Sequence, residues 1–451
     1  MRVGIIGFGF SGLMVTANLV RAAHAPCIIY VIAEDLRGLG VAYATTNADH
    51  LLNVVAGKMG AFADDLGGFH RWLSTADGAL ALQALHLTAR YQENDFVPRA
   101  LYGAYLQTIW RDTQALAAEK QIELKLVPTD AVAVTPGATL AILTARGDAI
   151  AVDRAVLASG HEIKPILPTV VSDAILQNPW AGDAFAGAAA WGAPVLLMGT
   201  GLTMIDTLMM LRAGGYAGAV IAFSRHGLLP QRHAPQASVF RFAKEQLLLQ
   251  KNLQHYVGLM RRTIRAHGDW RAVVDALRPH TTLLWQRLTT PDQKRFLERL
   301  GAYWSVHRHR MAPDIAARVD AEIASGALRI IASKKLVAEQ RDGQLHIALT
   351  DHHQLQHNFT PARLINCTGP ELNVEKSMRP LIRQVVAQGL VEPHATGIGI
   401  AADLHGRAWG TAFPQLYAVG ALLTGQLLES TAVPELRAQA VAVANHIVAS
   451  A

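Results

Sequence analysis

The stretch "RVGIIGFGFSGLMVTANLVRAA", residues 2–23, decides the fold. Val3–Ile6 is apolar and predicts a short buried strand, and a helix-forming run begins at Leu13. Three glycines stand between the strand and the helix in the pattern G-x-G-x-x-G. Gly7 would allow a tight turn, Gly9 would let a pyrophosphate approach the backbone, and Gly12 would let the helix pack closely on the strand. The N-terminus of such a helix offers N–H groups and a positive dipole end to phosphates.

An acidic residue follows the next strand at a suitable distance. Cys27–Ile32 predicts a second strand, and Glu34 lies 22 residues after Gly12. This spacing is typical of a carboxylate that binds ribose hydroxyls. The alternative, a glycine-rich hairpin, would not have a strand before the glycines, a helix after them and an acid at the end of the next strand. We therefore predict a dinucleotide site that uses Gly7, Gly9, Gly12 and Glu34.

A second fingerprint, "APVLLMGTGLTMIDTLMMLRAGG", occupies residues 193–215. Here we expect the strand Val195–Met198, a turn with Gly199 and Gly201, and a helix that starts at Thr203. Met204 replaces the third glycine, which predicts looser packing of the helix on the strand. The following strand, expected at residues 219–223, ends in Ser224-Arg225-His226 without an acid.

An arginine at this place suits the 2′-phosphate of NADPH. The alternative is that Arg225 is an ordinary surface charge. We expect Ser224 and Arg225 to belong to the nucleotide site, together with Gly199, Gly201 and Thr203.

The first glycines of the two fingerprints, Gly7 and Gly199, lie 192 residues apart, which indicates two nucleotide sites in one chain. The simplest arrangement places FAD on the first and NADPH on the second. Strands expected at residues 155–158 and 364–367 are followed by Gly160 and Gly369, and we interpret these points as crossings between domains. The predicted fold is α/β, with two Rossmann-like dinucleotide-binding domains, the second inserted in the first. The FAD domain would comprise residues 1–170 and 361–451, and the NADPH domain residues 171–360 with a helical insertion at 236–312.

The composition limits the class of protein. The chain has 451 residues, is 51% hydrophobic and carries a formal net charge of +6. These values suit a compact globular protein and argue against disorder and against a nucleic-acid partner. Cys27 and Cys367 form no C-x-x-C pair, which excludes a disulfide reductase and fits a reducing cytoplasm. The apolar N-terminal run also resembles a signal peptide, but its spaced glycines favour the strand and helix, and no segment predicts a membrane span.

The chain resembles a bacterial family of FAD/NAD(P)-binding proteins related to flavin monooxygenases that bind two dinucleotides. The matching stretches extend from one end of the sequence to the other: "GFGFSG", "GLGVAYATTNADHLLNVVAGKMGAFADD", "FVPRALYGAYL", "MGTGLTMID", "SRHGLLP", "YWSVHRHRMAP", "NCTGP" and "LYAVGALLTGQLLESTAVPELRAQA". They are specific for a cofactor architecture and not for one reaction.

The resemblance implies flavin-lining roles for residues 40–43 and 50–53, including Gly40, Tyr43 and Asn53. Arg99 is a candidate for the flavin pyrophosphate, or else a solvated residue at a helix start. Gly420-Ala421 stands where many relatives carry Gly-Asp for the ribityl chain, so Asp403, Glu429 or helix N–H groups would have to serve instead. Thr424-Gly425 and Thr431 are the nearest polar candidates before the last helix.

The resemblance implies an FAD-dependent oxidoreductase that NADPH reduces. We expect a monooxygenase that uses O2 to hydroxylate a small amine or another nucleophilic substrate through a flavin hydroperoxide. The alternatives are an NADPH-dependent flavin reductase or oxidase, and a non-catalytic FAD-binding protein. The sequence leaves the substrate open, and a homodimer also stays open.

One basic stretch, "GAYWSVHRHRMAP" at residues 301–313, leads into a helix expected at Pro313–Ala324. Arg308 and Arg310 just before a helix N-terminus form an anion-binding arrangement, and we expect them, with His307 and His233, to clamp a phosphate or an acidic substrate group. The alternative is a buried network that ties the helical insertion to the nucleotide fold. A shared metal is not expected, because His307 and His309 would point apart on a helix and no further ligand cluster is evident.

Overall fold

The computed structural model describes residues 1–24, 26–234, 238–410 and 415–450. The chain is a mixed α/β protein that divides into two compact units, each described by itself below. The first unit comprises Met1–Glu162, His280–Thr290 and Glu371–Ala451, and the second comprises Ile163–Pro279 and Pro291–Pro370. The chain thus passes between units close to the predicted crossings. The first two residues of the expected helical insertion, 236 and 237, lie outside the described residues.

A parallel sheet forms the centre of the first unit, with strand order β17-β7-β1-β2-β3. Its strands are β1 (Arg2–Ile6), β2 (Ile28–Ile32), β3 (Glu123–Val127), β7 (Arg154–Leu157) and β17 (Leu416–Ala418). β1 pairs in parallel with β2 on one side and with β7 on the other. The chain direction across the sheet therefore reverses at β1, and in open parallel sheets ligands bind outside the carboxyl ends of the strands at such a point. A three-stranded antiparallel sheet follows β3 and contains β4 (Ala131–Thr135), β5 (Leu140–Thr144) and β6 (Ala149–Val152).

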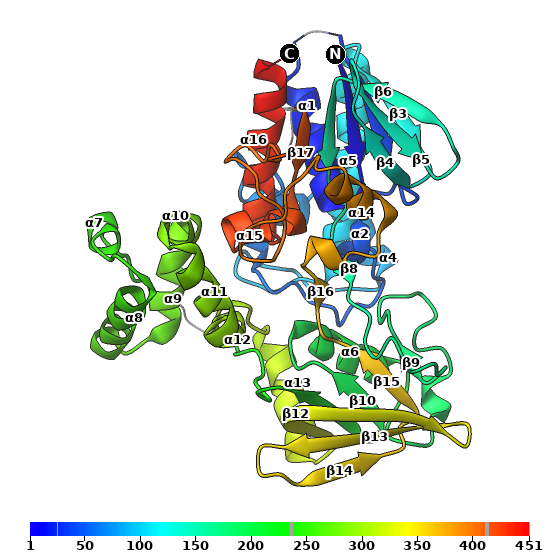
Figure 1. Cartoon of the computed structure of the whole chain (residues 1–451), viewed down its shortest axis with the longest axis vertical. Coiled ribbons are helices and arrows are strands. Elements are labelled where there is room, and N and C mark those ends of the chain that lie inside the picture. The colour runs from blue at the N-terminus through cyan, green and yellow to red at the C-terminus, as the bar shows by residue number, and fades with distance from the viewer. Residues whose placement is uncertain (25, 235–237, 411–414, 451) are drawn as a thin grey trace. The chain divides into compact units, whose positions relative to one another are not determined.

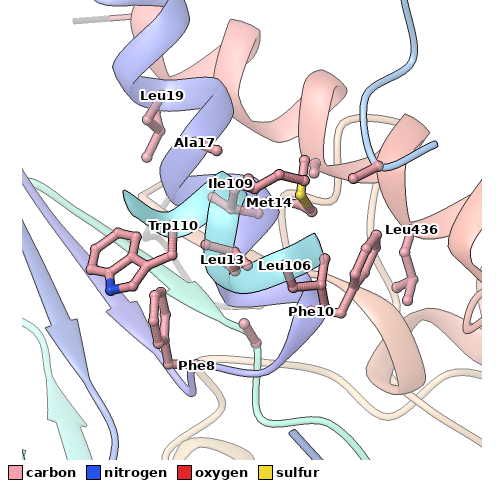
Figure 2. Close-up of a cluster of buried hydrophobic side chains, with 14 of the residues drawn as sticks. Phe8, Phe10, Leu13, Met14, Ala17, Leu19, Leu106, Ile109, Trp110 and Leu436 are labelled. Atoms are coloured by element: carbon pink, nitrogen blue, oxygen red, sulfur yellow. The ribbon is translucent and has the colours of Figure 1, made fainter. Parts of the chain in front are cut away.

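Helix α1 (Phe10–Ala22) packs against α5 (Arg99–Glu119) and α16 (Val433–Ala449), as Figure 1 shows. It is buried almost all round, so its sequence is apolar on every face. Its two buried polar side chains bond carbonyls one turn earlier: Thr16 Oγ1 donates to Gly12 O at 2.8 Å, and Asn18 Nδ2 donates to Met14 O at 2.7 Å. Figure 2 shows the core between these helices, where Phe8 meets the edge of Trp110 at 4.9 Å between ring centres.

The other helices of the first unit are α2 (Gly40–Tyr43), α3 (Gly68–Trp72), α4 (Ala76–Ala84), α10 (Thr281–Arg287), α14 (Pro380–Ala387) and α15 (Thr424–Leu427). Helix α10 lies within the sequence range expected for the second domain, yet it packs on α15. The reason is Trp285, which is 2% exposed and donates its Nε1–H to Gly425 O at 2.7 Å.

A seven-stranded mixed sheet forms the second unit, with order β14-β13-β12-β11-β10-β15-β9. Its strands are β9 (Ile175–Leu176), β10 (Val195–Met198), β11 (Val220–Ser224), β12 (Leu328–Arg341), β13 (Gln344–Asp351), β14 (Gln356–Phe359) and β15 (Arg363–Asn366). β10 pairs in parallel with β11 on one side and with β15 on the other. The second sheet therefore has its own reversal point, at β10. Two short strands, β8 (Glu162–Ile163) and β16 (Pro370–Glu371), pair with each other where the chain passes between the units.

The helices of the second unit are α6 (Leu202–Ala213), α7 (Lys244–Leu248), α8 (Leu253–His267), α9 (Trp270–Leu277), α11 (Thr290–Arg299), α12 (Gly301–Arg308) and α13 (Pro313–Ala324). The prediction of a helix at 313–324 is confirmed, with proline in its first turn and Gly326 at φ +77° just beyond its end. Among the described helices, none is long and apolar enough to cross a membrane.

Candidate functional site

The first glycine loop joins β1 to α1, and its geometry requires glycine at two positions. Gly7 has φ +95°, and a methyl group placed on it would lie 2.5 Å from Ala158 O at the end of β7. A methyl group on Gly12 would lie 2.1 Å from Gly7 O. Both distances are below van der Waals contact and involve backbone, so neither position accepts a side chain without a shift of the loop. The predicted reasons for Gly7 and Gly12, a tight turn and close helix packing, are what the structure contains.

Two further segments meet this loop at the carboxyl edge of the sheet. A methyl group on Gly9 would lie 3.3 Å from Gly40 Cα, and one on Gly420 would lie 3.3 Å from Ser11 Oγ. No side chain caps the N-terminus of α1 at Gly9. The predicted residues Gly7, Gly9, Gly40 and Gly420 are thus brought together around one helix N-terminus.

The crevice beside the loop contains an orphaned polar atom. Ser159 follows β7, with its Cα 3.1 Å from a methyl group placed on Gly7. Its Oγ is buried and has no hydrogen-bond partner among the described residues. Gly160, the next residue, is exposed at φ +67°. A backbone cradle, an uncapped helix N-terminus and a buried hydroxyl at one edge fit a dinucleotide pyrophosphate.

Tyr43 and Arg99 lie on neighbouring elements of the first unit. Tyr43 packs on Tyr102 of α5, with ring centres 4.7 Å apart, and burial raises its pKa to about 12, so the phenol stays neutral. Arg99 opens α5: its N–H donates to His50 O at 2.7 Å and its Nε donates to Leu51 O at 3.1 Å. Arg99 therefore holds the backbone of the segment that contains Asn53, and both residues are half-buried.

The acid predicted for the ribose is exposed beyond the end of β2. Glu34 lies beside Asp35, whose carboxylate bonds Arg37 Nη2 at 2.7 Å. The hydrogen bond from Arg37 holds the pKa of Asp35 below its usual range. Of these two acids, Asp35 is engaged by a neighbour and Glu34 is exposed to solvent.

The substitutes for the missing Gly-Asp carboxylate differ in their surroundings. Asp403 closes its own turn, since its carboxylate accepts the N–H groups of His405 and Arg407 and the Nε of Arg407 at 3.0 Å. Glu429 is 9% exposed. Thr431 is exposed and lies just before α16. Gly420 itself donates its N–H to Gln439 Oε1 at 2.8 Å.

The second glycine loop, between β10 and α6, repeats part of this design. Gly199 has φ +118°, and a methyl group on it would lie 2.1 Å from Cys367 O beyond the end of β15. A methyl group on Gly201 would meet nothing within 4 Å. Met204 occupies the third position and is fully buried. Thr203 lies in the first turn of α6, and Gly369 follows β15 at φ +86°.

The residues after β11 form a turn that is tied to this loop. Thr200 Oγ1 lies 2.8 Å from Ser224 Oγ and donates to Leu228 O at 2.6 Å. Arg225 is exposed, and its carbonyl accepts a hydrogen bond from His352 Nε2 at 2.9 Å. The structure thus brings Gly199, Gly201, Thr203, Ser224 and Arg225 to the carboxyl edge of the second sheet.

The basic stretch before α13 lies in a network within the second unit. Arg310 is 3% exposed, donates its Nε–H to His307 O at 2.9 Å and pairs with Asp275, and it lies 5.6 Å from the ring centre of Trp270. His307 packs edge-on against the same Trp270. His233 donates its backbone N–H to Met311 O, and Arg308 is 9% exposed. For Arg310 these contacts favour the structural alternative over a phosphate clamp.

Sequence reasoning missed Thr200, Ser159, Tyr102 and His352. Thr200 lies between two fingerprint glycines and Ser159 precedes Gly160, so their positions in the sequence were a usable signal. Tyr102 and His352 are far in sequence from the elements they contact, and no local pattern points to them. Among the described residues, no group of three His, Cys, Asp or Glu side chains could hold a metal ion.

Comparisons with known proteins agree with this geometry. Residues 4–162 match a family model described as FAD-NAD(P)-binding. A curated relative, the L-aspartate N-monooxygenase (nitrosuccinate-forming) of Streptomyces cremeus, is 29% identical over 51% of this chain, and the match spans 39% of that protein's length. The chain therefore spans about two fifths of this relative.

Two solved structures share the fold over nearly the whole chain. L-lysine 6-monooxygenase from Pseudomonas syringae has a TM-score of 0.67 at 14% identity and covers 100% of this chain and 99% of its own. The ornithine N-hydroxylase of Kutzneria sp. 744, solved with reduced FAD, NADP+ and L-ornithine, has a TM-score of 0.60 at 13% identity, with 100% and 99% coverage. These comparisons agree with the resemblance predicted from the sequence, since residues 4–162 match a model described as FAD-NAD(P)-binding.

Proposed function

We propose that the chain is an FAD-dependent oxidoreductase, reduced by NADPH, that hydroxylates the nitrogen of a small amine. The observation that carries the proposal is the duplicated glycine loop: in each of two sheets, a glycine-rich turn and a helix N-terminus lie at the reversal point between parallel strands. The two units would be Rossmann-like domains, the first for FAD and the second for NADPH.

The residues of the first loop would hold the flavin dinucleotide. Gly7 and Gly9 give the pyrophosphate access to the backbone, and the N-terminus of α1 supplies N–H donors and a positive dipole end. Glu34 would bind the ribose, and Gly40 and Tyr43 would lie against the ring system. In the second unit, Gly199, Gly201 and Thr203 would cradle the pyrophosphate of NADPH, and Arg225 would bind its 2′-phosphate.

When bound, the flavin accepts a hydride from the nicotinamide and, once reduced, activates oxygen. The chain's own residues would bind the two dinucleotides, orient them and exclude water from the site. The neutral, half-buried Tyr43 is suited to a ring site that excludes water, since it adds no charge there. Amine hydroxylation is favoured by the activities of the similar proteins, which act on aspartate, lysine and ornithine.

The test is a product assay with the purified, flavin-loaded chain, NADPH and air. L-Aspartate, L-lysine and L-ornithine are supplied separately, and hydroxylated product, peroxide and NADPH consumption are measured. We expect that, with one of these amines, NADPH consumption yields hydroxylated product in place of peroxide. NADPH oxidation that yields only peroxide with every amine would favour an oxidase, and no NADPH oxidation at all would overturn the proposal.

A further inference from the structure

The turn after β11 in the second unit, Ser224–Leu228, is held in place more firmly than an exposed loop requires. It lies at the carboxyl edge of the sheet, where β11 pairs with β12 up to Ser224 opposite Ala332. Gly227 has φ +61°, and a methyl group on it would lie 3.2 Å from Ala332 Cβ, so the turn rests directly on β12. The exposed Arg225 thus projects from a backbone that is packed on one side.

A chain of hydrogen bonds ties this turn to the glycine loop. Thr200 Oγ1 donates to Leu228 O at 2.6 Å, so its single proton is used there. Ser224 Oγ, 2.8 Å away, must then donate to Thr200 Oγ1, and it accepts the N–H of Gly227 at 3.1 Å. The hydrogen bonds from Gly227, Ser224 and Thr200 therefore all point in the same direction along this series. Thr200 is 5% exposed, so its hydrogen bonds are shielded from water.

A second anchor comes from the turn between β13 and β14. His352 Nε2 donates to Arg225 O at 2.9 Å, which fixes the backbone of Arg225 itself. The nearby carboxylate of Asp351 is occupied, because it accepts His357 Nε2 at 3.0 Å and the N–H groups of His353 and Leu355. The exposed Lys334 and Lys335 follow Ser333 on the adjacent strand. The hydrogen-bond acceptors of Asp351 are thus used within its own turn, whereas His352 of the same turn bonds Arg225.

We propose that Thr200, Ser224 and His352 are positioning residues that hold Arg225 to read a 2′-phosphate, and so set the preference of the second unit for NADPH over NADH. This inference rests on the proposed function, since it assigns specificity to the same nucleotide site. A guanidinium bonded to a phosphate forms charge-assisted, directional hydrogen bonds, and their strength depends on where the backbone places the side chain. The three positioning side chains need not touch the nucleotide to affect its selection.

The test is the dissociation constants of NADP+ and NAD+, measured by calorimetry on the full, flavin-loaded chain. We expect wild-type protein to prefer NADP+ and Arg225→Ala to weaken NADP+ about tenfold or more, which is the loss typical of one charge-assisted hydrogen bond, with NAD+ unchanged. Thr200→Val and His352→Phe should each weaken NADP+ about threefold to tenfold, and should have little further effect when combined with Arg225→Ala. Thr200→Ser and His352→Gln, which keep a donor, should restore most of the preference.

His353→Phe is the matched control, because His353 lies in the same turn and bonds Asp351 through its backbone N–H. It should leave both constants unchanged. Equal weakening of NADP+ and NAD+ by His352→Phe, or an undiminished effect in the Arg225→Ala background, would overturn the positioning role. Equal affinity of the wild-type chain for NADP+ and NAD+ would overturn the 2′-phosphate role of Arg225 while leaving hydride transfer intact. No binding of either nucleotide would overturn the proposed function as well.

Discussion

The two glycine loops share a backbone turn but differ in the side chains around it. In each unit, the first glycine lies against a carbonyl at the end of the neighbouring strand, Ala158 O for Gly7 and Cys367 O for Gly199. The third position differs: Gly12 lies against its own loop, whereas the buried Met204 occupies the equivalent position in the second unit. The residues after the next strand differ as well, with the exposed acid Glu34 in one unit and the exposed base Arg225 in the other. The backbone turn is thus common to both units. Under the proposed function, the side chains beyond the next strand would set the ligand preference of each unit.

The largest effect is expected where the two loops are alike. Gly7→Ala and Gly199→Ala each combine a positive φ with a backbone clash, so each should lower the free energy of unfolding by about 3 kcal/mol or more. Gly147→Ala is the control, because Gly147 has φ +90° and nothing within 4 Å of an added methyl group. Chemical denaturation of each variant measures the difference. A loss for Gly7→Ala no greater than that for Gly147→Ala would show that the contact with β7 carries no cost.

The next effect comes from the position where the loops differ. Gly12→Ala should displace Gly7 O and weaken FAD binding by about 2 kcal/mol, roughly thirtyfold, because the loop must shift away from the pyrophosphate. Fluorescence of released flavin during dilution measures this. The control is Gly137→Ala, where an added methyl group would meet only Thr139 O at 3.2 Å among its near neighbours. Unchanged flavin retention by Gly12→Ala would mean that the first unit tolerates a side chain there, as the second does.

A smaller effect should separate the two acids after β2. Glu34→Gln removes the charge from a hydrogen bond to the ribose and should weaken FAD binding by about 1.5 kcal/mol, roughly tenfold. Asp35→Asn should leave FAD binding unchanged, because the Asp35 carboxylate already bonds Arg37. The dissociation constant of FAD for both variants decides which acid is used. A larger effect of Asp35→Asn would transfer the ribose role to Asp35.

The smallest effect is expected at Arg310. A variant at this position tests whether a residue outside the glycine loop of the second unit binds a phosphate. Arg310→Met should lower the free energy of unfolding by about 1 kcal/mol, since its partner Asp275 is half-exposed and screened by water. The affinity for NADP+ should stay the same. Weaker NADP+ binding at unchanged stability would instead restore the phosphate clamp predicted from the sequence.

The structural features that depend on neighbouring residues could be predicted from the sequence. The strand–glycine–helix pattern placed β1, α1, β10 and α6 correctly, because the turn itself demands glycine and the flanking periodicity is strong. The helix at Pro313–Ala324 could be predicted because a proline begins it and a glycine follows its end. The long-range parts could not be predicted. Trp285 bonds Gly425 and so holds α10 within the first unit, and His352 bonds Arg225, which is 127 residues away in sequence. Neither contact produces a local sequence pattern.

Under the proposed function, one chain binds a flavin and a nicotinamide dinucleotide and passes a hydride between them. The most direct measurement is the flavin absorbance of the purified chain when NADPH is added under nitrogen and air is then admitted. We expect yellow protein, bleaching by NADPH faster than by NADH, and recovery of the colour in air. Yellow protein that NADPH leaves unbleached, or protein that purifies without flavin and takes none up, would contradict the claim.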